Sequence, residues 1–302
     1  MLTMPSHVLI EDEFLRDGLQ GEARRFSLDE KLHFARALGD CGVARIQLGS
    51  FVHPKRVPQM ADTEQLFAVL QQRPGVVYSA LVLNLRGVER AIAADVRHLS
   101  MSISASEAHS RNNTGRTLAE ARANILPMIE RALAGGVAVR AGVQCAFGSG
   151  LEPSVSPQLV IEIARSYREA GVAEMNLADT AGLANPKSTY ELVSRVREAV
   201  GDDIRLSLHL HDTRGLGIAN MFAGLQAGVT TFDTALGGVG GCPFIPKAAG
   251  NIATEDAAYA LEEMGVSTGI DWQRLCVLAI EAEEKLQRRL PGRMAYLQKE
   301  AA

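Results

Sequence analysis

Two histidines stand two residues apart in the stretch LSLHLHD, which spans residues 206–212 and ends in Asp212. Alternate residues of a β-strand point to the same face, so a strand here would project His209 and His211 side by side. Two neutral imidazoles that converge in this way can bind one metal ion. The alternative is a pair of inward histidines that only form hydrogen bonds. Their spacing at the end of an apolar strand favours the metal site.

A glycine-rich segment, GGVGGCPFIPKAAGN, spans residues 237–251 and contains Cys242. Its glycines predict a mobile loop or a close approach of the backbone to a ligand. A thiol with an ordinary pKa of about 8.5 is mostly protonated at neutral pH and can donate a proton. Two alternatives stay open: a buried inert thiol, and a loop that cradles phosphate, although the segment lacks the Walker pattern.

Eight β-rich runs recur along the chain, and a helical pattern follows each of them. The runs are residues 7–11, 44–51, 76–83, 98–104, 138–147, 174–179, 206–212 and 230–236. Most are continuous apolar runs, which is typical of parallel strands covered on both faces. Strand and helix alternate eight times, which predicts an α/β fold of the (β/α)8 TIM barrel type. The alternative is a doubly wound open sheet, but RDGLQG after the first run is not its glycine fingerprint.

The helical segments carry their own start and stop signals. Ser27 followed by Glu30 forms a capping-box pattern, and Pro157 and Pro186 occupy first-turn positions. We expect a single domain over residues 1–302, with the barrel over about residues 7–265. A helical extension over residues 266–302 is expected to add one C-terminal helix, DWQRLCVLAIEAEEKLQRR.

Composition excludes several classes of protein. The chain has 302 residues, of which 47% are hydrophobic, so it can bury a large core. A net charge of -4, from 31 Lys and Arg against 35 Asp and Glu, does not suggest a nucleic-acid or membrane partner. The four cysteines form no close pair, and the N-terminal stretch lacks a basic targeting segment. We therefore expect a soluble cytoplasmic protein.

Polar residues follow most of the predicted strands. They are Arg16, Asp17, Gln47, Ser50, Asn84, Arg140, Asp179, Thr180, His209, His211 and Asn251. The active site of such a barrel lies at the carboxyl ends of the strands. Asp17 is the natural carboxylate beside the two histidines, because only strand eight separates strands seven and one. Two histidines with a carboxylate and an amide fit a divalent ion such as Mg²⁺, Mn²⁺ or Zn²⁺.

Five motifs in order resemble 3-hydroxy-3-methylglutaryl-CoA lyase (HMG-CoA lyase) and its relatives, a group of metal-dependent lyase barrels. They are RDGLQ at 16–20, SFVHPKRVPQM at 50–60, NLADTAG at 176–182, HLHDTRGLGIAN at 209–220 and GGVGGCPFIPKAAGNIATED at 237–256. Each motif alone is weak, but the five together are specific, and the resemblance covers roughly residues 8–268.

The resemblance implies a metal-dependent retro-Claisen cleavage of a 3-hydroxyacyl-CoA, with HMG-CoA giving acetyl-CoA and acetoacetate. Its metal ligands would fall on Asp17, His209, His211 and Asn251, with Mg²⁺ or Mn²⁺ favoured over Zn²⁺. Arg16 would stabilise the enolate oxygen, Asp17 or Asp179 would act as the base, and Cys242 would protonate the enolate carbon. The candidates for contacts to the acyl-CoA substrate are Gln20, Gln47, Ser50, Asn84, Arg140 and Thr180. Relatives of this kind are often homodimers, and the additional C-terminal helix could supply a contact.

Four single positions and one segment, CAFGSGLEP at 145–153, depart from the pattern of these lyases. Gln47 stands in place of a glutamate, Asn176 of a serine, Ala23 of a lysine and Arg214 of a tyrosine. The metal ligands and Cys242 are retained, so lyase chemistry is expected, but the acyl group stays open. A lyase of the citramalyl-CoA type is the first alternative.

Three more distant functions stay open. A Claisen-condensing synthase shares the barrel, but Leu19 and the short tail argue against it. An aldolase acting on a free 2-oxo acid is disfavoured by the Cys242 loop. A catalytically silent barrel is kept open by Gln47.

Overall fold

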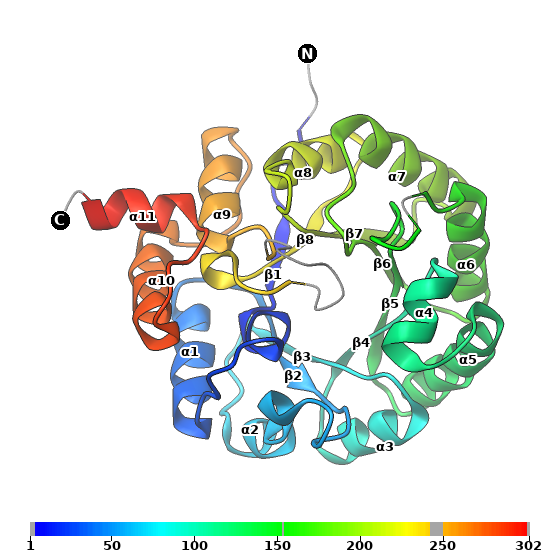
Figure 1. The fold of residues 1–302 in the computed structure, drawn as a ribbon, viewed down its shortest axis with the longest axis horizontal. Helices are drawn as coiled ribbons and strands as arrows, with labels where there is room; N and C mark the ends of the chain where they lie inside the picture. Colours follow the sequence, from blue (N-terminus) through cyan, green and yellow to red (C-terminus); the bar gives the residue numbers. More distant parts are fainter. Residues whose placement is uncertain (1–3, 153, 242–249, 301–302) are drawn as a thin grey trace.

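Eight parallel strands form a closed barrel in chain order (Figure 1). The computed structural model describes residues 4–152, 154–241 and 250–300. The strands are β1 (Leu9–Asp12), β2 (Arg45–Ser50), β3 (Val77–Leu81), β4 (His98–Ser104), β5 (Ala138–Gln144), β6 (Glu174–Asp179), β7 (Arg205–Leu210) and β8 (Thr231–Thr234). The residues of β1 pair one to one with those of β8, which closes the barrel. Each of the eight predicted runs becomes one strand, so the predicted (β/α)8 barrel is confirmed.

Helices surround the barrel (Figure 1). They are α1 (Leu28–Asp40), α2 (Thr63–Val69), α3 (Leu85–Ala93), α4 (Glu107–Thr114), α5 (Leu118–Ala134), α6 (Pro157–Glu169), α7 (Pro186–Val200), α8 (Gly217–Gln226) and α9 (Thr254–Glu263). The predicted capping box of Ser27 and Glu30 is present at α1, with Ser27 Oγ accepting from the Glu30 N–H at 3.2 Å. None of the helices in the described part of the chain combines the length and apolar character that crossing a bilayer requires.

The C-terminal extension contains two helices, α10 (Trp272–Leu286) and α11 (Arg293–Glu300). The predicted additional helix corresponds to α10, which packs against α1 and α9. The sequence interpretation missed α11, because its short polar pattern gives little periodic signal. The link between the two helices reaches the end of the barrel, where Gly292 N donates to Gly237 O at 3.1 Å.

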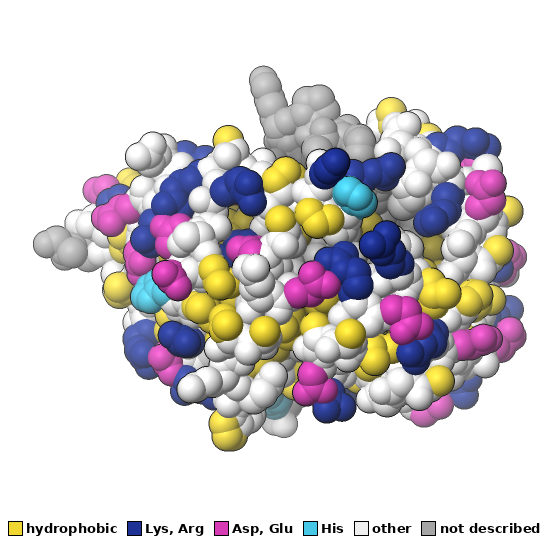
Figure 2. Space-filling model, turned by 90° about the horizontal axis from the view of Figure 1, so that it is seen from below, with side chains coloured by type: hydrophobic (Ala, Val, Ile, Leu, Met, Phe, Trp, Pro, Cys, Tyr) yellow, Lys and Arg dark blue, Asp and Glu magenta, His cyan; other side chains and the backbone are white. Residues whose placement is uncertain are grey.

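Three short helical turns complete the fold: η1 (Phe14–Gly18), η2 (Pro58–Met60) and η3 (Leu236–Gly238). The turn η1 follows β1 directly and carries Arg16 and Asp17. Phe14 anchors it, because its ring packs against Phe34 of α1 and against Phe26, at centroid distances of 4.9 and 6.0 Å. The outer surface in Figure 2 mixes charged side chains of both signs with apolar ones, as the small net charge leads us to expect.

Candidate active site

A cavity of about 670 Å³ opens at the carboxyl ends of the strands. This position agrees with the general location of active sites in such barrels. Of the predicted site residues, those that line the cavity are Arg16, Asp17, Gln20, Gln47, Asn84, Arg140, Thr180, His209 and His211. Polar groups from most of the strands therefore converge on one space, as the sequence pattern predicts.

The two histidines converge at the mouth of the barrel. Their Nε2 atoms lie 3.0 Å apart, and Asp17 Oδ2 lies 3.9 Å from His211 Nε2. One ligand atom from each of these three residues falls within 4.8 Å of the others. Asn251 Nδ2 donates to Asp17 Oδ2 at 2.8 Å. The other amide atom, Asn251 Oδ1, is buried and finds no hydrogen-bond partner among the described residues.

These contacts fit a bound cation. The imidazole nitrogens, the Asp17 carboxylate and the unpaired buried oxygen of Asn251 are all electron-pair donors. If the Asn251 amide turns so that Oδ1 takes the place of Nδ2 beside Asp17, a divalent ion would satisfy them together. His209 also shows the support expected of a metal ligand, because its Nδ1 faces Asp233 Oδ2 at 3.3 Å. A carboxylate behind a histidine fixes the ring and leaves the opposite nitrogen for the metal.

The charges of this cluster favour ligand binding. Burial acts to raise the pKa of Asp17, but Arg16 and the two histidines outweigh it and lower that pKa to about 2. Burial and the neighbouring His209 lower the pKa of His211 to about 4. Asp17 is therefore an anion and His211 a neutral ring at physiological pH. Burial opposes protonation of His209, but the hydrogen bond to Asp233 and the nearby carboxylates raise its pKa overall.

Local backbone structure brings the four residues together. His209 lies in β7, and His211 just after it forms an isolated antiparallel bridge with Asn251. Gly240 sits directly over the pair at a φ of 113°, where a Cβ would lie 2.5 Å from Asn251 Nδ2 and 2.8 Å from Asp17 Oδ2. Only glycine tolerates both this conformation and this approach.

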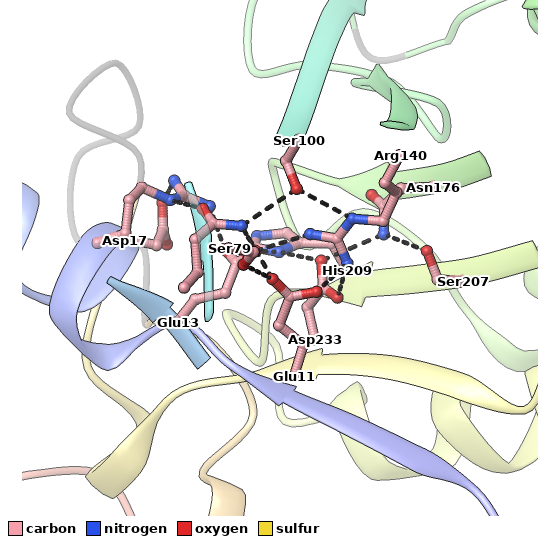
Figure 3. A network of polar contacts seen from close by, with 12 residues as sticks. Glu11, Glu13, Asp17, Ser79, Ser100, Arg140, Asn176, Ser207, His209 and Asp233 are labelled. Atoms are coloured by element: carbon pink, nitrogen blue, oxygen red, sulfur yellow. Dashed lines mark hydrogen bonds and ion pairs between the residues drawn. The ribbon is translucent and has the colours of Figure 1, made fainter. Parts of the chain in front are cut away.

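A buried network supports the cluster from within the barrel (Figure 3). Arg140 lies among three carboxylates and contacts Asp233 at 2.5 Å, Glu11 at 2.9 Å and Glu13 at 3.1 Å. Asp233 in turn contacts His209. The positive charge of Arg140 therefore offsets the negative charge of Asp233, the carboxylate that orients the candidate metal ligand His209.

Two of the predicted substrate-contact residues also accept hydrogen bonds from the backbone. Asn84 Oδ1 caps α3 by accepting from Gly87 N at 2.9 Å. Thr180 Oγ1 accepts from Cys145 N at 2.9 Å. Both still line the cavity, so either side chain can also face a ligand.

Three predicted site residues in the described part of the chain do not line the cavity: Asn251, which donates to Asp17, and Ser50 and Asp179. Ser50 is buried, and its hydroxyl contacts no described polar group. Asp179 accepts from the backbone N–H groups of Leu183 and Ala184, at 2.7 and 3.1 Å. Burial raises its pKa to about 6, yet these bonds hold the carboxylate against the loop after β6. Cys242 lies outside the described residues.

Sequence reasoning missed several polar residues of the cavity. Glu13 and Asp233 belong to the network, and His109 and Asn113 come from α4. One signal was available, because Asp233 interrupts an apolar strand and stands opposite His209 in the register of β7 and β8. Nothing in the sequence pattern shows that the chain after β4 folds back over the cavity.

Comparisons with known proteins agree with the geometry. A family model described as HMGL-like matches residues 7–280. The chain is 36% identical, over 92% of its length and 94% of the relative, to a 3-hydroxy-3-isohexenylglutaryl-CoA/hydroxy-methylglutaryl-CoA lyase of Pseudomonas aeruginosa. It is 38% identical, over 94% of its length and 93% of the relative, to an (R)-citramalyl-CoA lyase of Chloroflexus aurantiacus.

Solved structures are similar as well. A hydroxymethylglutaryl-CoA lyase of Pseudomonas aeruginosa matches with a TM-score of 0.94 at 34% identity, covering 99% of both chains. An HMG-CoA lyase of Acinetobacter baumannii, in complex with coenzyme A and 3-methylmalate, matches with a TM-score of 0.92 at 35% identity. That match covers 98% of this chain and 96% of the other.

Proposed function

The chain belongs to the HMGL-like family, and on this premise we propose that it is a metal-dependent lyase that cleaves a 3-hydroxyacyl-CoA. The proposed substrate is HMG-CoA, and the products are acetyl-CoA and acetoacetate. One observation carries this proposal: donor atoms of Asp17, His209 and His211 converge at the mouth of a cavity that Arg16 also lines, and the Asn251 amide lies beside Asp17.

The metal would be held by Asp17, His209, His211 and Asn251. Oxygen ligands make up half of this set and support Mg²⁺ or Mn²⁺, whereas Zn²⁺, which also binds imidazole and carboxylate groups, is the less favoured ion. When bound, the ion would act as a Lewis acid that makes the 3-hydroxyl group of the substrate more acidic.

Asp17 is the proposed base. With a pKa of about 2 it is ionised at neutral pH, although so acidic a carboxylate is a weak base on its own. It accepts the hydroxyl proton as the bond between C2 and C3 breaks, and the electron pair of that bond moves into the thioester enolate. We do not assign this role to Asp179, because its carboxylate is bonded to backbone N–H groups.

Arg16 is the proposed electrostatic group. Its guanidinium lies in the cavity wall and is fixed by Glu13, Asp17 and Gln47. A cation held in place before the reaction can stabilise negative charge on the enolate oxygen without reorganising. Cys242 then donates a proton to the enolate carbon, which releases acetyl-CoA.

A lyase of the citramalyl-CoA type is the second candidate, favoured by the similarity to the Chloroflexus aurantiacus enzyme. Two of the departures bear on the choice. Asn176 lines the cavity and can face an acyl group. Arg214 does not line it, since its Nη1 donates to the carbonyls of Ala181 and Gly182, at 3.1 and 2.7 Å.

Turnover of a panel of 3-hydroxyacyl-CoA thioesters tests the proposal. We expect release of acetyl-CoA from HMG-CoA with Mn²⁺ or Mg²⁺, and no release after treatment with a chelator. Cleavage of citramalyl-CoA but not of HMG-CoA would change the proposed substrate and leave the proposed retro-Claisen reaction in place. Condensation of acetyl-CoA with a 2-oxo acid, or no metal-dependent turnover of any thioester, would contradict the proposal.

A further inference from the structure

We propose that Glu13 and Gln47 form a carboxylate–amide pair that positions Arg16 for catalysis. The pair acts through Arg16, so both are positioning residues. This inference rests on the proposed function for its kinetic test, but it concerns an arrangement of side chains that can also be measured without turnover.

Arg16 uses all three of its nitrogens in separate contacts. Nε donates to Gln47 Oε1, Nη2 to Glu13 Oε2, and Nη1 to Asp17 Oδ1 at 2.6 Å. The side chain is only 12% exposed, so water competes weakly for these donors. A guanidinium bonded at three nitrogens cannot rotate without breaking a partly buried contact, and this fixes the direction in which its charge acts.

Gln47 links Arg16 to the carboxylates of Glu13 and Glu11. While its Oε1 accepts from Arg16, its Nε2 donates to Glu13 Oε1 at 2.9 Å and to Glu11 Oε1 at 3.2 Å. The oxygen must face the cation and the nitrogen must face the carboxylates, so the network determines the orientation of the amide. Arg16, Glu13 and Gln47 thus form a closed triangle in which each residue contacts the other two.

The electrostatics explain why position 47 carries an amide. Glu11, Glu13 and Asp233 already share Arg140 in the barrel interior. A carboxylate at position 47 would face Glu11 and Glu13 at about the present bond lengths with no proton to donate. Like charges this close, removed from water, destabilise each other strongly. Position 47 can therefore become acidic only if position 13 becomes neutral.

This reasoning predicts that the two positions are exchangeable as a pair. In Glu13→Gln, Arg16 loses a charged partner. In Gln47→Glu, a third carboxylate is forced against Glu11 and Glu13. In the double variant, the carboxylate at 47 accepts from Arg16, and the amide at 13 donates to that carboxylate. The triangle then has its original charge and Glu11 is the one carboxylate that still faces position 47, although Arg140 loses one of its acidic partners.

Steady-state kinetics of the three variants test the pair. We expect each single change to lower kcat about 100-fold, by analogy with the loss of one preorganised electrostatic donor, with KM changed less than about threefold. The double variant should recover at least about tenfold in kcat over the worse single variant. Mn²⁺ affinity should stay within about threefold throughout, and Glu64→Gln, a surface carboxylate paired with Arg90, serves as the control. Single variants with normal kcat, or a double variant in which the losses multiply, would overturn the inference.

A spectroscopic measurement separates this inference from the proposed function. The side-chain Nε–H of Arg16 should give a slowly exchanging ¹⁵N–¹H resonance in the parent protein, absent in Arg16→Lys. Its chemical shift and its exchange rate should change in both single variants and return toward the parent values in the double variant. If the parent protein cleaves no thioester, the proposed function is wrong. The resonance still tests whether Glu13 and Gln47 together hold Arg16, because it does not depend on turnover. A resonance that is unchanged in both single variants would contradict it.

Discussion

The facing imidazole nitrogens explain why an apolar strand carries two histidines. His209 Nε2 and His211 Nε2 lie 3.0 Å apart and are both buried. Without an ion, a ring proton lies between these two nitrogens, and burial together with the neighbouring His209 keeps His211 neutral by lowering its pKa to about 4. A cation can take the place of that proton and bind both nitrogens, so the spacing suits a pair of metal ligands.

Cys242 provides a prediction at the scale of a single residue. Cys242→Ala should lower turnover by about 10²–10⁴-fold, the usual range for a lost general acid, because the enolate would have to take its proton from water. Mn²⁺ should bind with unchanged affinity, measured by calorimetry, because the thiol is not among the proposed ligands. Cys41→Ala, which removes a buried thiol outside the cavity lining, is the matched control. Turnover equal to that of this control would remove Cys242 from the mechanism.

The predictability of individual site residues follows from their backbone setting. Asp17, His209 and His211 were predictable because strand alternation and barrel closure fix where such side chains point. Glu13 was not, although it comes directly after β1. Glu13 contacts Arg16 only because the turn η1 brings the Arg16 side chain back toward it, and no periodicity in the sequence predicts that turn.

At the scale of elements, helix α9 carries a buried acid beside the glycine-rich turn. Glu255 is fully buried in the first turn of α9, and its Oε2 accepts from Gly237 N at 3.0 Å. Burial, with a contribution from Asp256, raises the pKa of Glu255 from 4.5 to about 8. The folded protein therefore holds this proton at pH values where the unfolded chain has released it.

The stability of the protein should respond to this group. Between pH 4.5 and 8 the folded state binds more protons than the unfolded state, so Glu255 lowers the free energy of unfolding as pH rises. At the upper end of this pH range, the loss in the free energy of unfolding that Glu255 causes should be on the order of 2–4 kcal/mol. The free energy of unfolding, measured with urea, should therefore fall less between about pH 5 and pH 8 in Glu255→Gln than in the parent protein. Glu262→Gln, on the exposed side of the same helix, should follow the parent. Parallel profiles for the parent and Glu255→Gln would contradict the assigned pKa.

Elements were predicted well where one physical signal dominated. Continuous apolar runs gave all eight strands, and the capping box gave the start of α1. The turn η1 and helix α11 were missed for a common reason. Tertiary contacts hold both of them, such as the packing of Phe14 on Phe34, and local pattern does not reveal these contacts.

At the scale of the whole molecule, the barrel and the C-terminal helices support the same site. Leu290, between α10 and α11, packs so close to Gly237 that a Cβ there would lie 2.5 Å from its Cδ1. Glu255 links the same glycine to α9. We therefore propose that the barrel and the extension fold as one domain. A homodimer and a cytoplasmic location stay predictions.

The central claim is that one divalent cation binds at the mouth of the barrel, and a manganese-soaked crystal tests it most directly. The account predicts an anomalous peak between Asp17, His209, His211 and Asn251, with Asn251 Oδ1 turned toward it. The absence of density among these four side chains, or side chains that point apart, would contradict the account.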